Sequence, residues 1–293
     1  MRFIHITDPH LSSLEEHSFL GLRGKRRSGY LSWRRNRRHV HRREILDQLT
    51  AAALAHRPDL VLVTGDLVHI GLEDEIIEAA AWLKQLGPPG RVLFVPGNHD
   101  NYARDSLGAM YTYWQDYLPG TYPPDGDYAA GYPMVRVQEH VKFICVNSAC
   151  TTRVFSARGE LGAQQRRRLA AELAMDPDEK RFQCLLIHHP PFPGMTKSRK
   201  ALRDAATLRE IISLRPVHLA LYGHIHINRE DPGNAVRSFC TASASDIHSA
   251  SYRVFDVEQA GSGWDCRMRL MSLDAKAAPR AEFSLAAEVA WRV

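Results

Sequence analysis

Residues 91–100 read RVLFVPGNHD, an apolar run that ends in a glycine followed by three polar side chains. Residues 59–66, DLVLVTGD, have the same form, a buried strand followed by a turn and a carboxylate. Short apolar strands of this kind alternate along the chain with stretches of helical periodicity. The other expected strands are 1–7, 141–148, 182–191 and 217–226, and the expected helices are 44–57, 73–87, 157–174 and about 204–214.

This alternation predicts the fold. A strand, a helix and a second strand in succession form a right-handed crossover, which builds a largely parallel sheet. The tail beyond residue 235 is expected to add β-hairpins, and residues 282–291, EFSLAAEVAW, have the pattern of a short amphipathic helix. We find no internal repeat and no low-complexity linker, so we predict one α/β domain over residues 1–293, layered α/β/β/α.

The 293 residues carry a net charge of +5, but the charge is concentrated in one place. Residues 23–43 contain ten Lys and Arg residues and no acidic residue, whereas the rest of the chain has a net charge of −5. This distribution favours one anion-facing patch over a surface for bulk nucleic-acid binding. The five cysteines are scattered without a CxxC pair, which indicates reduced thiols. No apolar run approaches the ~20 residues of a membrane span. We therefore expect a cytoplasmic protein.

The polar residues at the strand ends form a candidate site. Eight of them follow five separate strands: Asp8, His10, Asp66, Asn98, His99, His188, His224 and His226. In open α/β sheets this carboxyl edge is where ligands bind. A mixed shell of His, Asp and Asn suits divalent metals such as Mn²⁺, Fe²⁺ or Zn²⁺, and two such ions sharing one carboxylate favour displacement at phosphorus.

The motifs DPH, GD, GNHD, HHPP and GHIH, in that order, resemble those of the calcineurin-like metallophosphoesterases over about residues 1–260. The resemblance implies a four-layer α/β/β/α sandwich and two divalent metal ions, with Mn expected and Fe, Zn or Co as alternatives. It implies that Asp8, His10 and His226 bind one metal, that Asn98, His188 and His224 bind the other, and that Asp66 bridges the two. The nucleophile would be a hydroxide held between the metals.

The same resemblance implies roles for the residues beside the ligands. His99 would bond a phosphoryl oxygen or protonate the leaving group, and Asp100 would orient its imidazole. His188 rather than His189 is expected to be the ligand, and His69 is expected to be a satisfied loop histidine.

A basic insertion, about residues 19–43, separates the first ligands from the first long helix. Apolar residues are interleaved with its charges, a pattern typical of segments that lie on an anionic membrane or grip an amphiphilic anion. A plain solvated loop is the alternative. The residues expected to bind substrate or membrane are Arg23, Lys25, Arg26, Arg27, Tyr30, Trp33, Arg34, Arg35, Arg37 and Arg38.

Within the family, this insertion resembles that of the UDP-2,3-diacylglucosamine pyrophosphohydrolases of lipid A synthesis. The resemblance implies cleavage of that nucleotide-activated lipid by a peripheral protein at the inner membrane surface. The motifs GNHD and HHPP fit a cyclic-nucleotide or glycerophosphodiester phosphodiesterase equally well. A lipid- or nucleic-acid-binding module with an inactive site is a weaker alternative, because every ligand position is present. We expect no specific nucleic-acid partner, because the basic residues form one block rather than a groove.

Overall fold

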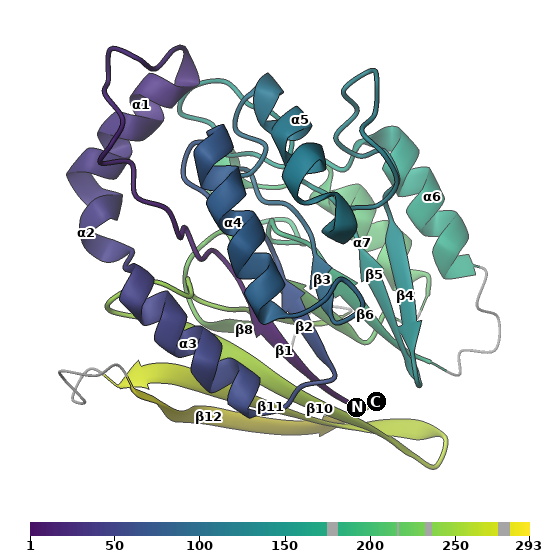
Figure 1. The fold of residues 1–293 in the computed structure, drawn as a ribbon. Helices are drawn as coiled ribbons and strands as arrows, with labels where there is room; N and C mark the ends of the chain where they lie inside the picture. The colour runs from purple at the N-terminus through teal and green to yellow at the C-terminus, as the bar shows by residue number, and fades with distance from the viewer. Residues whose placement is uncertain (175–180, 216, 232–235, 275–281) are drawn as a thin grey trace.

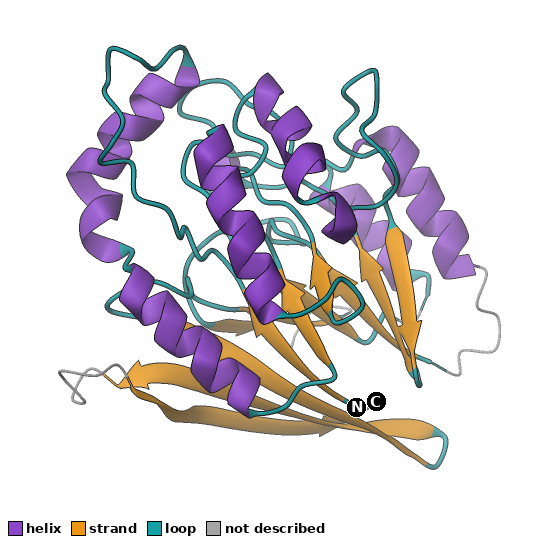
Figure 2. Ribbon diagram, in the orientation of Figure 1, coloured by secondary structure: helices purple, strands orange, loops and turns teal. Residues whose placement is uncertain are grey.

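Two six-stranded mixed sheets lie face to face in the computed structural model, with helices on their outer sides (Figures 1 and 2). The structure describes residues 1–174, 181–215, 217–231, 236–274 and 282–293. Its strands are β1 (Arg2–Ile6), β2 (Leu60–Val63), β3 (Val92–Phe94), β4 (Met134–Gln138), β5 (Val141–Cys145), β6 (Phe182–Leu186), β7 (Leu219–Tyr222), β8 (Arg229–Asp231), β9 (Arg237–Cys240), β10 (Ser251–Ala260), β11 (Gly263–Asp274) and β12 (Glu282–Arg292). The α-helices are α1 (Lys25–Ser32), α2 (Arg38–Val40), α3 (Arg43–Ala55), α4 (Glu73–Leu86), α5 (Arg104–Tyr113), α6 (Gly162–Ala174) and α7 (Ala205–Ser213).

The strand order explains how the polar strand ends come together. The first sheet runs β12-β11-β10-β1-β2-β3, and the second runs β4-β5-β6-β7-β9-β8. Strands β1, β2 and β3 are parallel to one another, as are β5, β6, β7 and β9. Parallel strands end at the same edge, so the loops that follow β1, β2, β3, β6 and β7 share one end of the sandwich.

Three apolar layers hold the sandwich together. The middle layer joins the inner faces of both sheets and includes Phe3, Phe143 and Phe255, all fully buried. The second layer packs α3, α4 and α5 on the first sheet, and the third packs α6 and α7 on the other. The predicted four-layer α/β/β/α arrangement is confirmed.

The tail differs from the prediction at residues 282–291. The helix expected there is wrong, because these residues form β12, which pairs antiparallel with β11 from Asp265 to Asp274. Phe283, Val289 and Trp291 alternate with exposed residues and pack on buried clusters. A long neighbouring strand with free backbone groups therefore overrides the helical preference of the alanines.

The basic insertion is helical and has its own apolar anchor. Helix α1, a π-helical turn (Trp33–Arg37) and α2 follow one another, and Figure 1 shows them as an arm at one end of the molecule. Leu22, Tyr30 and Trp33 are buried against Leu14, Ile70 and Tyr102 of the main body. The apolar side of the insertion thus faces the protein, so Tyr30 and Trp33, which were predicted to bind substrate or membrane, are buried in contact with the protein itself.

Two of the insertion's arginines support the docked arm. Arg26 pairs with Asp105 at 2.7 Å and donates to the carbonyl oxygens of Ile70 and Gly71. Arg27 donates to the carbonyl of Leu22 at 2.7 Å. Arg23, Arg34, Arg35 and Arg38 are exposed. Searching the described residues yields no helix with the length and apolarity needed to cross a membrane.

Replacing Gly29 with alanine tests this docking. A Cβ at Gly29 would overlap the side chains of Tyr102 and Ile70, both buried. We expect Gly29→Ala to lower the free energy of unfolding by about 1–3 kcal/mol in urea titrations, although alanine normally favours a helix. Gly90→Ala, where a Cβ meets nothing within 4 Å, is the matched control and should be neutral. A stabilised Gly29→Ala protein would contradict the docked arrangement.

Candidate metal centre

Five loops bring the predicted ligands together at one end of the sandwich. The first group comprises Asp8, His10, Asp66 and His226, whose ligand atoms all lie within 4.8 Å of one another. Nε2 of His226 lies 3.1 Å from Oδ1 of Asp8, and Nε2 of His10 lies 3.9 Å from Oδ2 of Asp66. These four residues come from the ends of β1, β2 and β7, as the sequence predicted.

A second group lies on the other side of Asp66. Nε2 of His188 is 3.3 Å from the same Oδ2 of Asp66 and 3.2 Å from Nδ1 of His224. The neighbouring His189 also lies within 4.8 Å of this group, but its Nδ1 bonds to the Ser148 hydroxyl and its Nε2 to the Ala157 carbonyl. This geometry supports Asp66 as the bridge and His188 as the ligand.

Hydrogen bonds to the surrounding chain orient these side chains. Asp66 Oδ1 accepts the His99 amide at 2.7 Å, which leaves Oδ2 for the two histidine groups. Nδ1 of His10 donates to the Val68 carbonyl and Nδ1 of His188 to the Thr64 carbonyl, so each presents Nε2 to the site. Such outer bonds fix the tautomer and ring orientation of metal-binding histidines.

The backbone at the site is strained. Asp8, His10, Asp66, His224 and His226 have φ between 40° and 70°, the left-handed region that L-residues avoid. Residues held in this region cost about 1–3 kcal/mol each and concentrate at functional sites. Gly97 permits the close approach of two of these loops, since a Cβ there would overlap Oδ1 of Asp66.

The donor set fits two divalent cations. Nε2 of His10, Oδ1 of Asn98 and Nε2 of His224 are buried without a hydrogen-bond partner. A buried polar atom left without a partner costs roughly 1–3 kcal/mol. Three such atoms together indicate that metal ions would be their partners. Mixed histidine nitrogen and carboxylate oxygen donors suit Mn, Fe, Zn and Co without selecting among them.

The protonation states of the histidines suit metal binding. Burial lowers the pKa of His10 and His224 well below the usual value, and lowers that of His41 to about 3. Burial also disfavours the charged form of His188, but the carboxylates of Asp66 and Asp8 outweigh it and raise its pKa to about 9. A cation between these carboxylates and His188 would replace that proton.

His99 and Asp100 have partners other than those predicted. Nδ1 of His99 donates to the carbonyl of His69, and its Nε2 accepts from Arg37 at 2.8 Å. The carboxylate of Asp100 bonds to backbone amides within the described chain: those of Asp66, Leu67, Val68 and Gly97. The role predicted for Asp100, orienting the His99 imidazole, is therefore wrong, because this carboxylate instead joins the loops after β2 and β3.

Three residues at the site were not predicted to belong there. His41, from the end of the insertion, groups with His10 and His226 within 4.8 Å. His69 stacks on His10 at 5.1 Å; its ring bonds to the backbone of Ser12, while its Nδ1 is buried without a partner in the described part of the chain. Lys200 lines the cavity above the ligands, which has a volume of about 250 Å³. The DxH and GHxH spacings indicated the ligands, but no local pattern indicated these residues.

Arg37 is the predicted substrate-binding residue that reaches the site. It lines the same cavity, together with Asp66, Asn98 and His224. Burial lowers the pKa of its guanidinium, while the nearby Asp66 opposes this effect. The insertion therefore delivers one arginine to the metal centre.

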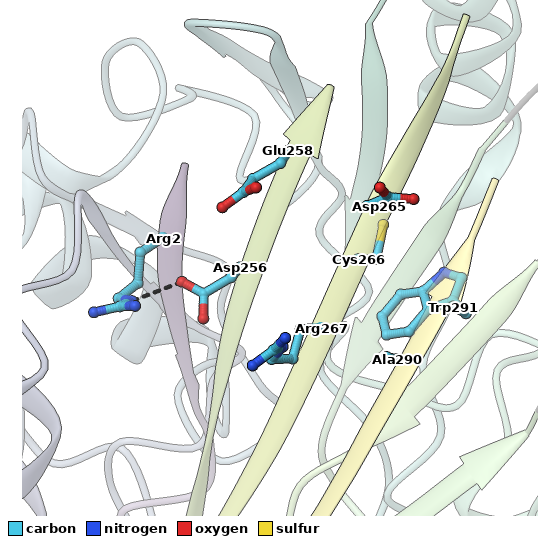
Figure 3. A pocket seen from close by; sticks show the side chains of 8 residues that line it. All are labelled: Arg2, Asp256, Glu258, Asp265, Cys266, Arg267, Ala290 and Trp291. Carbon is cyan, nitrogen blue, oxygen red and sulfur yellow. Dashed lines mark hydrogen bonds and ion pairs between the residues drawn. The ribbon is translucent and has the colours of Figure 1, made fainter. Parts of the chain in front are cut away.

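A larger cavity of about 640 Å³ lies elsewhere, over β1, β10, β11 and β12 (Figure 3). Asp256 in its wall is already paired with Arg2 and Arg269, each at 2.7 Å. In the described part of the chain, each possible metal-binding group contains residues from the strand ends instead, joined in one group by His41 of the insertion. We therefore take the strand-end cavity as the candidate active site.

Comparison with known proteins agrees with this geometry. The family model for calcineurin-like phosphoesterases matches residues 1–228. The chain belongs to the calcineurin-like phosphoesterase family, whose members are metal-dependent hydrolases with two metal ions. The predicted family, fold and enzyme class are confirmed.

Individual relatives are more distant. A protein of Synechococcus sp. (strain WH7803), described as a probable cyclic nucleotide phosphodiesterase, is 26% identical over 93% of this chain and 91% of its own. A Rhodococcus erythropolis protein with the same description is 26% identical over 63% of this chain and 56% of its own length. A dimetal phosphatase from Danio rerio superposes with a TM-score of 0.61 at 15% identity, covering 98% of this chain and 99% of that one, and shows the shared fold.

Asp66→Asn tests the shared carboxylate. An amide offers one oxygen instead of two and carries no charge, so we expect bound Mn²⁺ or Zn²⁺ to fall from about two ions per chain to one or none. The count is made by mass spectrometry of the desalted protein. Asp116→Asn, an exposed carboxylate on the surface, should keep the full count. Two tightly held ions in the Asp66 variant would exclude the bridging role.

Asp100→Asn tests the loop-joining carboxylate. We expect the metal-free variant to lose about 2–4 kcal/mol of unfolding free energy, because asparagine offers one acceptor oxygen in place of two and leaves at least one buried amide without its acceptor. Urea unfolding in the presence of a chelator measures this loss, with Asp116→Asn again as the control. A change below about 0.5 kcal/mol would mean that the amides are satisfied in another way.

Proposed function

We propose that this protein is a nucleotide phosphodiesterase. The observation that carries the proposal is the Asp66 carboxylate between two histidine groups, at the base of a cavity that also contains Arg37 and Lys200. Two divalent cations held by these residues would supply an activated water and neutralise charge that develops at phosphorus. The two relatives described as probable cyclic nucleotide phosphodiesterases support a cyclic nucleotide as the first substrate to test.

Arg37 would hold the phosphoryl group. Its planar guanidinium can donate two parallel hydrogen bonds to phosphate oxygens. His99 positions it, because Nδ1 of His99 donates to the His69 carbonyl and Nε2 is left to accept from Arg37. In this arrangement His99 carries no proton on the nitrogen that faces the cavity, so it acts by orienting Arg37 rather than by protonating a leaving group.

An exposed aromatic ring favours a nucleotide over a simpler phosphodiester. Phe155 is 84% exposed, has φ 65° and lies in the wall of a cavity beside the metal cavity. Tyr102 lines the same cavity. An exposed ring next to a phosphate site offers a face on which a base can stack, which is worth about 1–3 kcal/mol per base.

The lipid substrate has less support. UDP-2,3-diacylglucosamine would need an apolar surface for its acyl chains, but the insertion's Tyr30 and Trp33 are buried in the protein. Phe19 and Leu20 are the large apolar residues that the insertion leaves exposed, and they lie on its first turn, before α1. The relatives also carry no description of that activity.

The direct test is ³¹P NMR of the Mn²⁺-loaded protein with cyclic AMP, with glycerophosphocholine and UDP-2,3-diacylglucosamine micelles in parallel tubes. We expect cyclic AMP to be opened to a monoester, and opening to stop when EDTA removes the metal. Hydrolysis of either parallel substrate with cyclic AMP left intact would refute the nucleotide phosphodiesterase proposal.

Phe155→Ala tests base stacking. We expect KM for cyclic AMP to rise about tenfold, with kcat changing less, because the variant lacks a stacking contact of this size with the bound base. Hydrolysis of bis(p-nitrophenyl) phosphate, which has no base, should keep its kcat/KM within twofold. Tyr122→Ala is the matched control, an exposed aromatic that lines a different cavity. Equal KM values for Phe155→Ala and the wild type would remove this argument for a nucleotide.

A further inference from the structure

A second cavity of about 260 Å³ adjoins the metal cavity. The two share five lining residues: Arg37, Asn98, His99, Ala157 and Lys200. A ligand whose phosphate lies over the metals would therefore extend directly into this second space. Residues of α1 and of the short 3₁₀ helix Ser198–Lys200 also line it.

The second cavity is lined by cations without a carboxylate. Lys25 and Arg37 come from the insertion, and Arg199 and Lys200 come from the 3₁₀ helix. The remaining lining residues are uncharged or are the histidine already described. Four cations and no carboxylate in the lining make this cavity favourable for an oxyanion, although Asp66 lies near enough to act on Lys25, Arg37 and Lys200.

Two of these cations have no partner in the part of the chain that the structure describes. Within that part, no hydrogen bond or ion pair reaches the side chain of Arg199, which is exposed, or that of Lys200, which is partly buried, so the cost of burial applies to Lys200. Elsewhere, partly buried arginines are paired, as Arg26 is with Asp105 and Arg43 is with Glu78. Leaving a partly buried cation unpaired is unfavourable, and this indicates that a ligand supplies the counter-charge.

Lys25 is held in the cavity by neutral groups. Its Nζ donates to the Thr152 hydroxyl at 2.9 Å and lies 4.2 Å from the centre of the Tyr102 ring. Burial lowers the pKa of Lys25 to about 8, and Asp66 opposes that shift. The ammonium is thus held in position without an ion-pair partner among the described residues, and it is close enough to Asp66 for the two charges to interact.

We propose that this second cavity is a subsite for a second phosphate of the substrate, one that lies next to the phosphorus attacked at the metals. The inference rests on the proposed phosphodiesterase function and deepens it. Two divalent cations would more than neutralise Asp8 and Asp66, so neither carboxylate would then balance Lys25, Arg199 and Lys200. A cyclic mononucleotide carries one negative charge and leaves these cations unpaired, whereas a nucleotide with two phosphates pairs them.

Equilibrium binding separates this inference from the activity. Isothermal titration of the Mn²⁺-loaded protein compares AMP with α,β-methylene-ADP, which carries the second phosphate and resists cleavage. We expect α,β-methylene-ADP to bind at least about tenfold more tightly, since charge-assisted bonds to a phosphate are gained. The Arg199→Gln/Lys200→Gln double variant should lose this tenfold preference in affinity. It should also fold normally, because the native Arg199 and Lys200 side chains make no hydrogen bond or ion pair with the described chain that the substitutions would break.

Arg35→Gln is the matched control, an exposed arginine of the insertion that lines neither cavity. It should keep the tenfold preference and so exclude a general effect of net charge. Equal affinity for the two ligands, or a preference that survives in the double variant, would overturn the subsite. Failure of the phosphodiesterase proposal is seen separately, as cyclic AMP left intact by a protein that still prefers α,β-methylene-ADP.

Adenosine 3′,5′-bisphosphate distinguishes where the second phosphate is attached. A preference for α,β-methylene-ADP over this bisphosphate supports a substrate with a pyrophosphate linkage. The reverse preference would place the second phosphate elsewhere on the ribose and would overturn a subsite next to the attacked phosphorus. The preference for α,β-methylene-ADP should fall about tenfold in the Arg199→Gln/Lys200→Gln variant.

Discussion

One carboxylate has to face two histidine groups at once. Oδ2 of Asp66 lies between Nε2 of His10 and Nε2 of His188, while Oδ1 is held by a backbone amide. Asp66 and His10 follow strands of the first sheet, whereas His188 follows a strand of the second. The spacing of the metal centre is therefore set by how the two sheets pack. Phe3 fixes that packing, with its ring 5.3 Å from Phe143 and 5.2 Å from Phe255. Because such interiors are densely packed, volume changes in this layer would move the ligands.

The site is assembled at a cost that the neighbouring loops offset. Two features disfavour the metal-free fold. They are the left-handed backbone at five candidate ligands and the buried nitrogen and oxygen atoms that have no hydrogen-bond partner within the ranges that the structure describes. Two buried carboxylates compensate by accepting loop amides. Asp100 binds the amides that follow β2, and Glu75, in the first turn of α4, binds those of His69, Ile70 and Leu72. These acceptors keep the ligand loops in place before any metal arrives, so the ions meet a site whose geometry is already set.

The sequence predicted what is local and left open what depends on distant contacts. Strand periodicity and the DxH, GNHD and GHxH spacings were sufficient for the layers and for the set of candidate ligands that meet at one edge, because each is encoded within about ten residues. The helix predicted for residues 282–291 was wrong because pairing with β11 decided their conformation. Asp100 was misassigned because its partners are amides, which no side-chain pattern reveals. His41 and Lys200 reach the site only through the folding of the insertion and of the 3₁₀ helix, and the direction of Trp33 depends on Ile70 and Tyr102.

The basic insertion shows why net charge alone does not assign a partner. Its arginines divide by structure: Arg26 and Arg27 satisfy carbonyls and an acidic residue, Arg34 and Arg35 face solvent, and Arg37 enters the metal cavity. The division follows from the anchor, because burial of Tyr30 and Trp33 fixes which side of the arm faces inward. An arm held by its own apolar cluster positions Arg37 beside the candidate metal ligands, and its last residues also bring His41 into the group with His10 and His226. In the function proposed above, the same arm would therefore influence both substrate binding through Arg37 and metal binding through His41, so the burial of Tyr30 and Trp33 matters to both.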